Sequence, residues 1–200
     1  MRTCLATVES VKSLSDSLPE GLIIRSGNVA ASLLAICKDL DVSVVYATRS
    51  FDTHGMLEQS AVAESLYGAG ISLQLVGSNY AVQPGTVRKD DESPLRVYTP
   101  FYKRWVQFIG QRPIEVKTES VSWVAGSGEL PELSQDCTMK IQASEAYALD
   151  TWRRFQKRAL RDYSENRNRT DLSGTSHLSH ALAHGEIHPR TLLAELGDSP

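Results

Sequence analysis

The sequence predicts an α/β fold with a parallel sheet, followed by a helical region. In residues 1–90, short apolar runs alternate with amphipathic segments, which is typical of strands and helices in a parallel sheet. From residue 143 onward, apolar side chains recur every three or four positions, as they do on one face of a helix. The stretch between these regions is rich in residues that form loops. We therefore predict an α/β domain over 1–90, a connection over 91–142 and helices over 143–200.

The first region should contain three helices and three strands. Helices are expected near 4–17, 29–39 and 55–68, and strands over 22–25, 42–47 and 71–76. The run at 42–47 is almost continuously apolar, as strands buried on both faces are. Gly21, Gly27 and Gly70 lie at the ends of these elements, where tight connections are needed.

The connection should hold one short helix and a long loop. Pro84, the acidic run 90–92 and Pro94 indicate loops, and Pro100 lies where a helix through Ile109 would begin. After Pro113 the chain is polar and contains glycines and a further proline. Long irregular loops are uncommon inside a compact domain, so this stretch is expected to join two domains.

The last region should form three helices. In the first of them, the apolar positions are Leu149, Trp152, Phe155, Ala159, Leu160 and Tyr163, with the arginines on the opposite side. A second helix should begin near Thr175 and end by Gly185, and a third should follow Pro189. The hydroxyl groups of Thr175 and Ser176 would then lie at a helix start, which favours a phosphate-bearing ligand. Simple helix capping is the alternative.

Charge is distributed unevenly along the chain. The formal net charge is −3, but residues 151–170 hold seven basic and two acidic side chains, so that segment carries +5 and the remainder −8. Such an asymmetry indicates an anionic partner, for example nucleic acid or phosphate. The solvated face of a surface helix is the alternative.

Several classes of site are not predicted. The three cysteines are far apart in the chain and form neither a disulfide framework nor a zinc motif. No apolar run is long enough for a membrane span, and a cytoplasmic location is expected. No dinucleotide-binding, Walker, nucleophile-elbow or His-Glu-x-x-His motif is present. His177, His180, His184 and His188 recur at metal-binding spacing, but no cysteine accompanies them and few carboxylates are suitably spaced, so no metal site is predicted.

An ordered series of motifs extends over nearly the whole chain. The series consists of residues 21–28 (GLIIRSGN), 44–49 (VVYATR), 96–101 (RVYTPF), 162–167 (DYSENR), 171–179 (DLSGTSHLS) and 185–190 (GEIHPR), together with Gly55 and Trp105. In this order, the motifs resemble the DNA photolyase and cryptochrome family. The resemblance implies a partial Rossmann-like antenna domain without its first strand. A long connecting loop and the start of an all-helical FAD-binding domain would follow it.

The resemblance also implies roles for particular residues. Those matching family positions that contact FAD, mainly around its phosphates and ribose, are Tyr163, Thr175, Ser176, His177, Leu178 and Ser179. Position 177 is commonly Arg or Lys in the family, so His177 is expected to weaken the electrostatic part of that contact. Arg167 matches a position that faces damaged DNA. The residues that would meet the flavin ring and the lesion are expected beyond residue 200, so no catalytic residue is predicted here.

The activity that the resemblance implies is that of a deoxyribodipyrimidine photolyase. In such proteins, light-excited reduced FAD donates an electron to a cyclobutane pyrimidine dimer that has been flipped out of the DNA. A cryptochrome-like blue-light receptor, or a non-catalytic nucleotide-binding remnant, is the alternative. The chain by itself is expected to be inactive.

Two further expectations concern the antenna pigment and self-association. The Asn-Glu pair associated with folate-using members is replaced by His54 and Gly55. A folate antenna is therefore not expected, while a deazaflavin, a flavin or no antenna stays open. We also expect Trp152, Phe155 and the leucines at 192–193 to lack packing partners, leaving an apolar patch that favours self-association.

Overall fold

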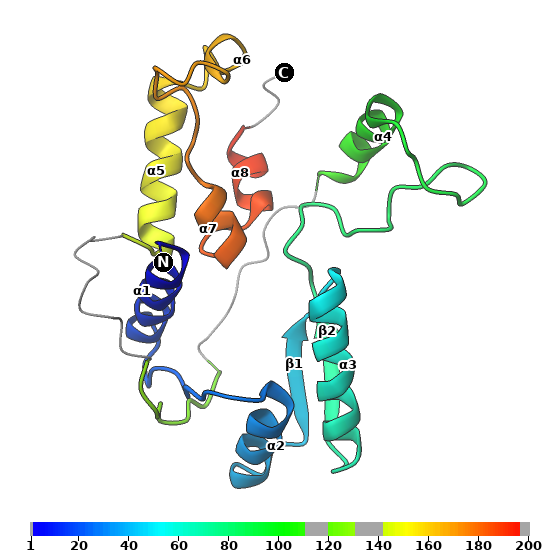
Figure 1. Ribbon diagram of the computed structural model, residues 1–200, viewed down its shortest axis with the longest axis vertical. Coiled ribbons are helices and arrows are strands. Elements are labelled where there is room, and N and C mark those ends of the chain that lie inside the picture. Colours follow the sequence, from blue (N-terminus) through cyan, green and yellow to red (C-terminus); the bar gives the residue numbers. More distant parts are fainter. Residues whose placement is uncertain (1, 111–119, 131–141, 197–200) are drawn as a thin grey trace. The chain divides into compact units, whose positions relative to one another are not determined.

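The computed structural model describes residues 2–110, 120–130 and 142–196 (Figure 1). Residues 25–111 form one compact unit, and residues 1–24 together with 112–200 form a second. The domain boundaries predicted from the sequence stay predictions. Among the described residues, no helix is both long and apolar enough to cross a membrane.

The unit of residues 25–111 contains the parallel sheet that the sequence predicts. Strands β1 (Val44–Thr48) and β2 (Ser72–Val76) pair in parallel, with Val44 opposite Ser72 and Thr48 opposite Val76. Helix α2 (Val29–Asp39) precedes β1 in the sequence, and helix α3 (Thr53–Tyr67) connects β1 to β2. A buried cluster joins both helices to the sheet and consists of Cys37, Val62, Leu66 and Ile71, with Val45 and Leu73 among the residues packed against it. The α/β class is therefore confirmed.

Helices α2 and α3 both begin after a residue whose side chain caps them. The Asn28 side chain accepts a hydrogen bond from the Ala31 amide at 2.9 Å, and Asp52 accepts one from the Gly55 amide at 2.8 Å. The latter bond holds the pKa of Asp52 below its ordinary value. A Cβ at position 55 would lie 2.7 Å from the Ser50 Oγ, so this turn has little room for any residue except glycine.

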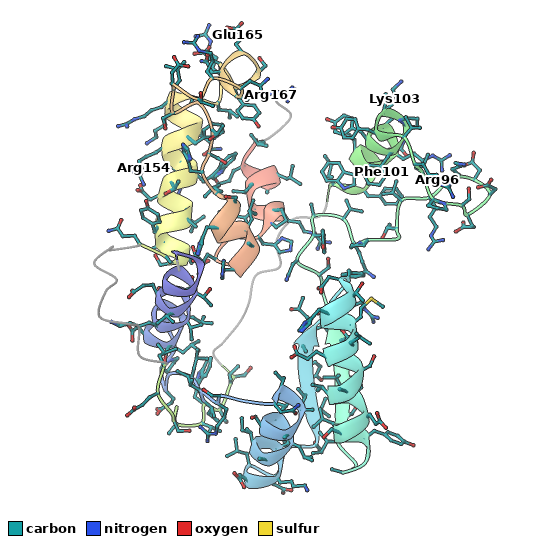
Figure 2. All side chains as sticks on the ribbon, viewed as in Figure 1. Arg96, Phe101, Lys103, Arg154, Glu165 and Arg167 are labelled. Carbon is teal, nitrogen blue, oxygen red and sulfur yellow. The ribbon has the colours of Figure 1, made fainter. Side chains whose placement is uncertain are left out.

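The same unit ends in a short aromatic helix. Helix α4 (Tyr98–Trp105) continues into a 3-10 turn η1 (Val106–Phe108), close to the helix predicted through Ile109. Pro100 is the third residue of α4 rather than the first, which the helix tolerates because the first-turn amides have no intrahelical partner. In Figure 2, Phe101 and Lys103 lie on α4 and Arg96 lies just before it.

The other unit is helical. It contains α1 (Arg2–Ser17), α5 (Glu145–Arg158), α6 (Tyr163–Asn166), α7 (Ser179–His184) and α8 (Pro189–Leu196). Its buried core consists of Ala148, Trp152, Phe155, Leu178, Ala181 and Ile187, and Leu192 is among the residues packed against it. The expectation that Trp152 and Phe155 lack partners is therefore wrong. Residues of α7 and α8 pack against these two side chains. Figure 1 shows α7 beside α5.

Two predicted helix boundaries also differ from the structure. Helix α5 ends at Arg158 because Ala159 leaves the helical conformation, with φ at −134°, although its amide still reaches Phe155 O. Tyr163 instead begins α6, and its ring packs edge-on against Phe155 with 5.8 Å between centroids. The apolar periodicity predicted the packing correctly but extended the helix too far.

The strand predicted at 22–25 is not formed. Ile23 makes a single parallel bridge with Ser127, the Ile24 amide donates to Ser127 O at 2.7 Å, and the Ser127 amide donates to Leu22 O at 3.1 Å. A Cβ at Gly126 would lie 2.7 Å from Glu20 O, so a glycine is needed for this close approach. The backbone groups of 20–24 therefore pair with 126–127. The long loop predicted after Pro113 is irregular over its described residues 120–130 apart from this bridge, and its other parts lie outside the described residues.

Candidate cofactor site

The residues predicted to hold a cofactor lie in the helical unit, on α6 and on the loop that leads from α6 to α7. Glu165 and Arg167 mark the end of α6 in Figure 2. The loop runs from Arg167 to Leu178, and Ser179 is the first residue of α7. We call residues 174–178 the cofactor loop.

Gly174 brings the start of the cofactor loop close to the end of α6. A Cβ at this position would lie 2.9 Å from Asn166 O and 3.0 Å from the Asn166 Cβ. Any larger residue would push the loop away from α6, because one of these contacts is with backbone. The segment before Thr175 is therefore placed by close packing.

Leu178 anchors the other end of the loop. Its side chain is only 3% exposed and belongs to the core cluster with Trp152 and Phe155. The Leu182 amide donates to Leu178 O at 2.9 Å, which makes Leu178 the residue from which α7 starts. A cofactor contact at this position would therefore come from the backbone, since the side chain is used for packing.

The predicted start of α7 at Thr175 is wrong. The helix begins at Ser179, is six residues long, and has no side-chain cap at Leu178. The reason is His177, whose φ of 53° lies in the left-handed region and interrupts a right-handed helix. The hydroxyl groups of Thr175 and Ser176 thus neither cap a helix nor lie at its first amides, and the helix-start argument for an anion site fails.

The cofactor loop nevertheless presents hydrogen-bonding groups that are not in use. Within the described chain, the hydroxyls of Thr175, Ser176 and Ser179 make no hydrogen bond. Thr175 and Ser176 are half-buried, and His177 is exposed with its Nε2 at 3.3 Å from the Ser173 Oγ. The Tyr163 ring, which packs on Phe155, is 40% exposed. Hydroxyl donors and a partly exposed aromatic ring are groups that suit a ligand with phosphate or sugar oxygens and a flat ring.

Arg167 is an exposed cation at the end of α6. Its amide donates to Tyr163 O at 2.9 Å, and its guanidinium has no acidic partner among the residues that the structure covers. Arg169 differs, because its Nε and Nη2 donate to both oxygens of Asp171 at 2.8 and 2.6 Å. This pairing lowers the pKa of Asp171 and leaves Arg167 as the cation of the two that is open to an anionic ligand.

The histidines do not converge on one point. The rings of His180 and His184 stack with centroids 4.2 Å apart, whereas the His188 Nδ1 accepts from the Arg190 amide at 3.1 Å. The described residues contain no group of three or more metal-ligating side chains. The sequence places Glu186 close to these histidines but past the helix end, and in the structure its Oε1 lies 3.6 Å from the His180 Nδ1, after α7 has ended at His184.

Comparison with known proteins places the chain in a family. Residues 3–119 match the family model for DNA photolyase. The chain is 25% identical over 197 residues to the deoxyribodipyrimidine photo-lyase of Alkalihalophilus pseudofirmus, covering 93% of this chain and 41% of that protein. It is 27% identical over 180 residues to the enzyme of the same name from a Synechococcus strain, covering 83% of this chain and 37% of that one.

The chain thus spans about two fifths of the length of these relatives. Its fold is similar to that of a bacterial class III photolyase from Agrobacterium tumefaciens, with a TM-score of 0.77 at 24% identity, over 98% of this chain and 44% of that structure. The family model covers more than half of the 200 residues. On this ground, the chain belongs to the DNA photolyase family.

Proposed function

We propose that this chain carries the phosphate- and ribose-binding part of an FAD site in a deoxyribodipyrimidine photolyase-like protein, which repairs cyclobutane pyrimidine dimers in DNA under light. The observation that carries the proposal is the cofactor loop. Its hydroxyls lack partners among the described residues, while Gly174 and Leu178 hold its two ends. Family membership and the names of the relatives support the same assignment.

In this proposal the chain binds and orients the cofactor. FAD, when bound, supplies the light-driven electron transfer. Thr175 and Ser176 donate hydrogen bonds to its phosphate and ribose oxygens, and the exposed part of the Tyr163 ring packs against it. His177 adds a ring nitrogen donor where the family commonly has a permanent cation. Leu178 contributes through its backbone, because its side chain lies in the core.

Arg167 is assigned to the DNA backbone. Arginine is well suited to phosphate because its guanidinium presents several donors in a fixed plane. The position is exposed and has no competing carboxylate among the described residues. The assignment therefore predicts a contact that adds affinity without reading the base sequence.

The cofactor assignment is tested by titrating FAD into the purified chain and following flavin fluorescence. Replacing both Thr175 and Ser176 with alanine should weaken binding by about tenfold or more, since hydrogen bonds to charged groups contribute roughly 1.5–3 kcal/mol. Thr170→Ala is the matched control, because its hydroxyl is exposed, lies in the same connection and has no partner in the described chain. Equal FAD affinity of the double variant and the wild type would reject the assignment.

The DNA assignment is tested with a duplex that holds one cyclobutane dimer, over a series of salt concentrations. Arg167→Ala should reduce the slope of log affinity against log salt by about one unit, as the loss of one phosphate contact does. Arg169→Ala is the control, since Asp171 already neutralises Arg169. If the two variants change the slope equally, the assignment of a DNA phosphate contact to Arg167 rather than to Arg169 is wrong.

Three finer points complete the proposal. We place the protein in the cytoplasm, in keeping with three cysteines that form no disulfide framework in the sequence. No folate antenna is included, because His54 and Gly55 replace the Asn-Glu pair associated with folate-using members. Self-association is not included either, since the core covers Trp152 and Phe155.

A further inference from the structure

Helix α1 contacts the end of α7 through hydrogen bonds between residues that are far apart in the sequence. The Ser10 hydroxyl donates to the Glu186 Oε1, across 176 positions. Thr7 Oγ1 and His184 Nε2 are hydrogen-bonded at 2.8 Å, across 177 positions. Both pairs lie within the helical unit. We call these four residues the α1–α7 seam.

The seam is built around a buried carboxylate. The Glu186 side chain is only 6% exposed. Gly185 adopts the left-handed conformation, and the amides of Gly185 and Glu186 both donate to Ala181 O, which ends α7 and turns Glu186 back toward it. The His180 Nδ1 lies 3.6 Å from Oε1, beyond ordinary hydrogen-bond length, whereas the Ser10 hydroxyl donates a hydrogen bond to this oxygen.

The histidine half of the seam has a defined donor pattern. His184 Nδ1 lies 3.1 Å from His180 O, which is an acceptor only, so Nδ1 carries a hydrogen there. In a neutral ring, Nε2 is then the acceptor, and Thr7 supplies the hydrogen. The stack of His184 on His180 extends this contact by one turn of α7 toward the cofactor loop.

Helix α7 needs such outside contacts because it is short. A helix of six residues has too few hydrogen bonds to be stable alone. On one side, Leu178, Ala181 and Ile187 hold it to the core. On the other side the seam holds its last residue and the turn that follows. The cofactor loop enters α7 directly through Leu178, so a movement of α7 displaces the loop.

We propose that Ser10 and Thr7 are positioning residues for the cofactor loop. Ser10 acts through Glu186, which follows α7, and Thr7 acts through His184, the last residue of α7. The part of this inference that concerns FAD binding rests on the proposed function. Ser10→Ala leaves the buried Glu186 carboxylate without its hydroxyl donor. Helix α7 should then be less stable, and the cofactor loop should bind FAD less tightly. Ser10→Thr keeps a hydroxyl and should restore the wild-type behaviour.

The first measurement is hydrogen exchange of the full chain without ligand, read by mass spectrometry. Ser10→Ala should exchange about tenfold faster over 174–184, and Ser10→Thr should not. Ser13→Ala is the matched control, since it makes the same change on the same helix at a hydroxyl with no partner in the described residues. Unchanged exchange over 174–184 would overturn the inference, and so would an equal acceleration in α5, which would indicate general destabilisation of the helical unit.

The second measurement is the FAD titration with the same three variants. Ser10→Ala should lose affinity by about the factor seen in exchange, because both report the fraction of chains with an ordered loop. Faster exchange with unchanged FAD affinity would overturn the positioning role and leave a purely structural contact. A wild-type chain that binds no FAD would reject the proposed function instead, and the exchange result would still decide whether Ser10 orders the loop.

Discussion

Replacing Leu178 with alanine tests whether the cofactor loop is anchored by the core of the helical unit. The wild-type side chain is 3% exposed and lies in one cluster with Trp152 and Phe155. The change removes three carbon atoms from that cluster. At about 0.8 kcal/mol for each buried methylene-sized group, the transfer term is roughly 2.4 kcal/mol.

The cavity left behind adds to this cost. Substitutions of buried leucine by alanine destabilise proteins by about 2–5 kcal/mol in total, depending on how far the surroundings relax. We expect a loss near 3 kcal/mol, which is a large part of the roughly 5–15 kcal/mol that ordinary domains have. Loss of FAD binding in this variant would then follow from unfolding of the loop anchor.

The assay is urea unfolding followed by the fluorescence of Trp152, in a chain where Trp105 and Trp123 are replaced by phenylalanine. This reports on the helical core rather than on the whole chain, which matters because two compact units need not unfold together. Leu172→Ala is the control, since Leu172 lies in the same connection but is 45% exposed, and its effect should stay within about 0.5 kcal/mol. A loss below about 1 kcal/mol for Leu178→Ala, or one equal to the control, would refute the anchoring argument.

Three further predictions concern single residues. Gly174→Ala should lower the free energy of unfolding by about 1–3 kcal/mol, because the added Cβ would meet backbone atoms. Gly110→Ala, at a site with open space, should change this free energy little, and thermal unfolding of the two variants compares them. Because its ion pair with Arg169 lowers the pKa of Asp171, this carboxylate contributes stability above its unfolded pKa, near 3.8, and loses it as pH falls through the lower folded value. Asp171→Asn should therefore reduce the loss of stability on acidification below about pH 4, measured by urea midpoints at several pH values. His177→Arg should tighten FAD binding severalfold at neutral pH by adding a permanent charge beside the phosphates, and an affinity equal to that of the wild type in fluorescence titration would contradict this.

Local patterns in the sequence predicted much of the fold. The runs at 42–47 and 71–76 became the parallel pair β1 and β2. The burial on both faces that the apolar run at 42–47 predicted is wrong, because exposed and half-buried residues alternate along both strands. The three- and four-residue spacing around Trp152 predicted the core face of α5. Asn28 and Asp52 cap helices through bonds to residues three positions away, which short-range chemistry settles.

The errors lie where a residue's conformation depends on distant partners. The strand at 22–25 failed because its backbone bonds go to 126–127, about a hundred positions further along the chain. The predicted start of α7 failed because His177 adopts a left-handed conformation, a choice that no residue pattern in the loop indicates. The cofactor contacts assigned to Thr175 and Ser176 stay predictions, and the helix start on which they were argued is wrong, because α7 begins at Ser179.

The amino-acid sequence was enough to predict the α/β class, the helical region from residue 143 onward, the family and the candidate cofactor residues. These depend on composition, periodicity and ordered motifs, which are properties of neighbouring residues. The folded chain was needed to show that Leu178 lies in the core, that Gly174 packs closely against Asn166 and that the Ser10 hydroxyl donates to the carboxylate of Glu186. The physical reason is that close packing and the satisfaction of buried polar groups are set by whichever atoms the fold brings together, whatever their separation along the chain.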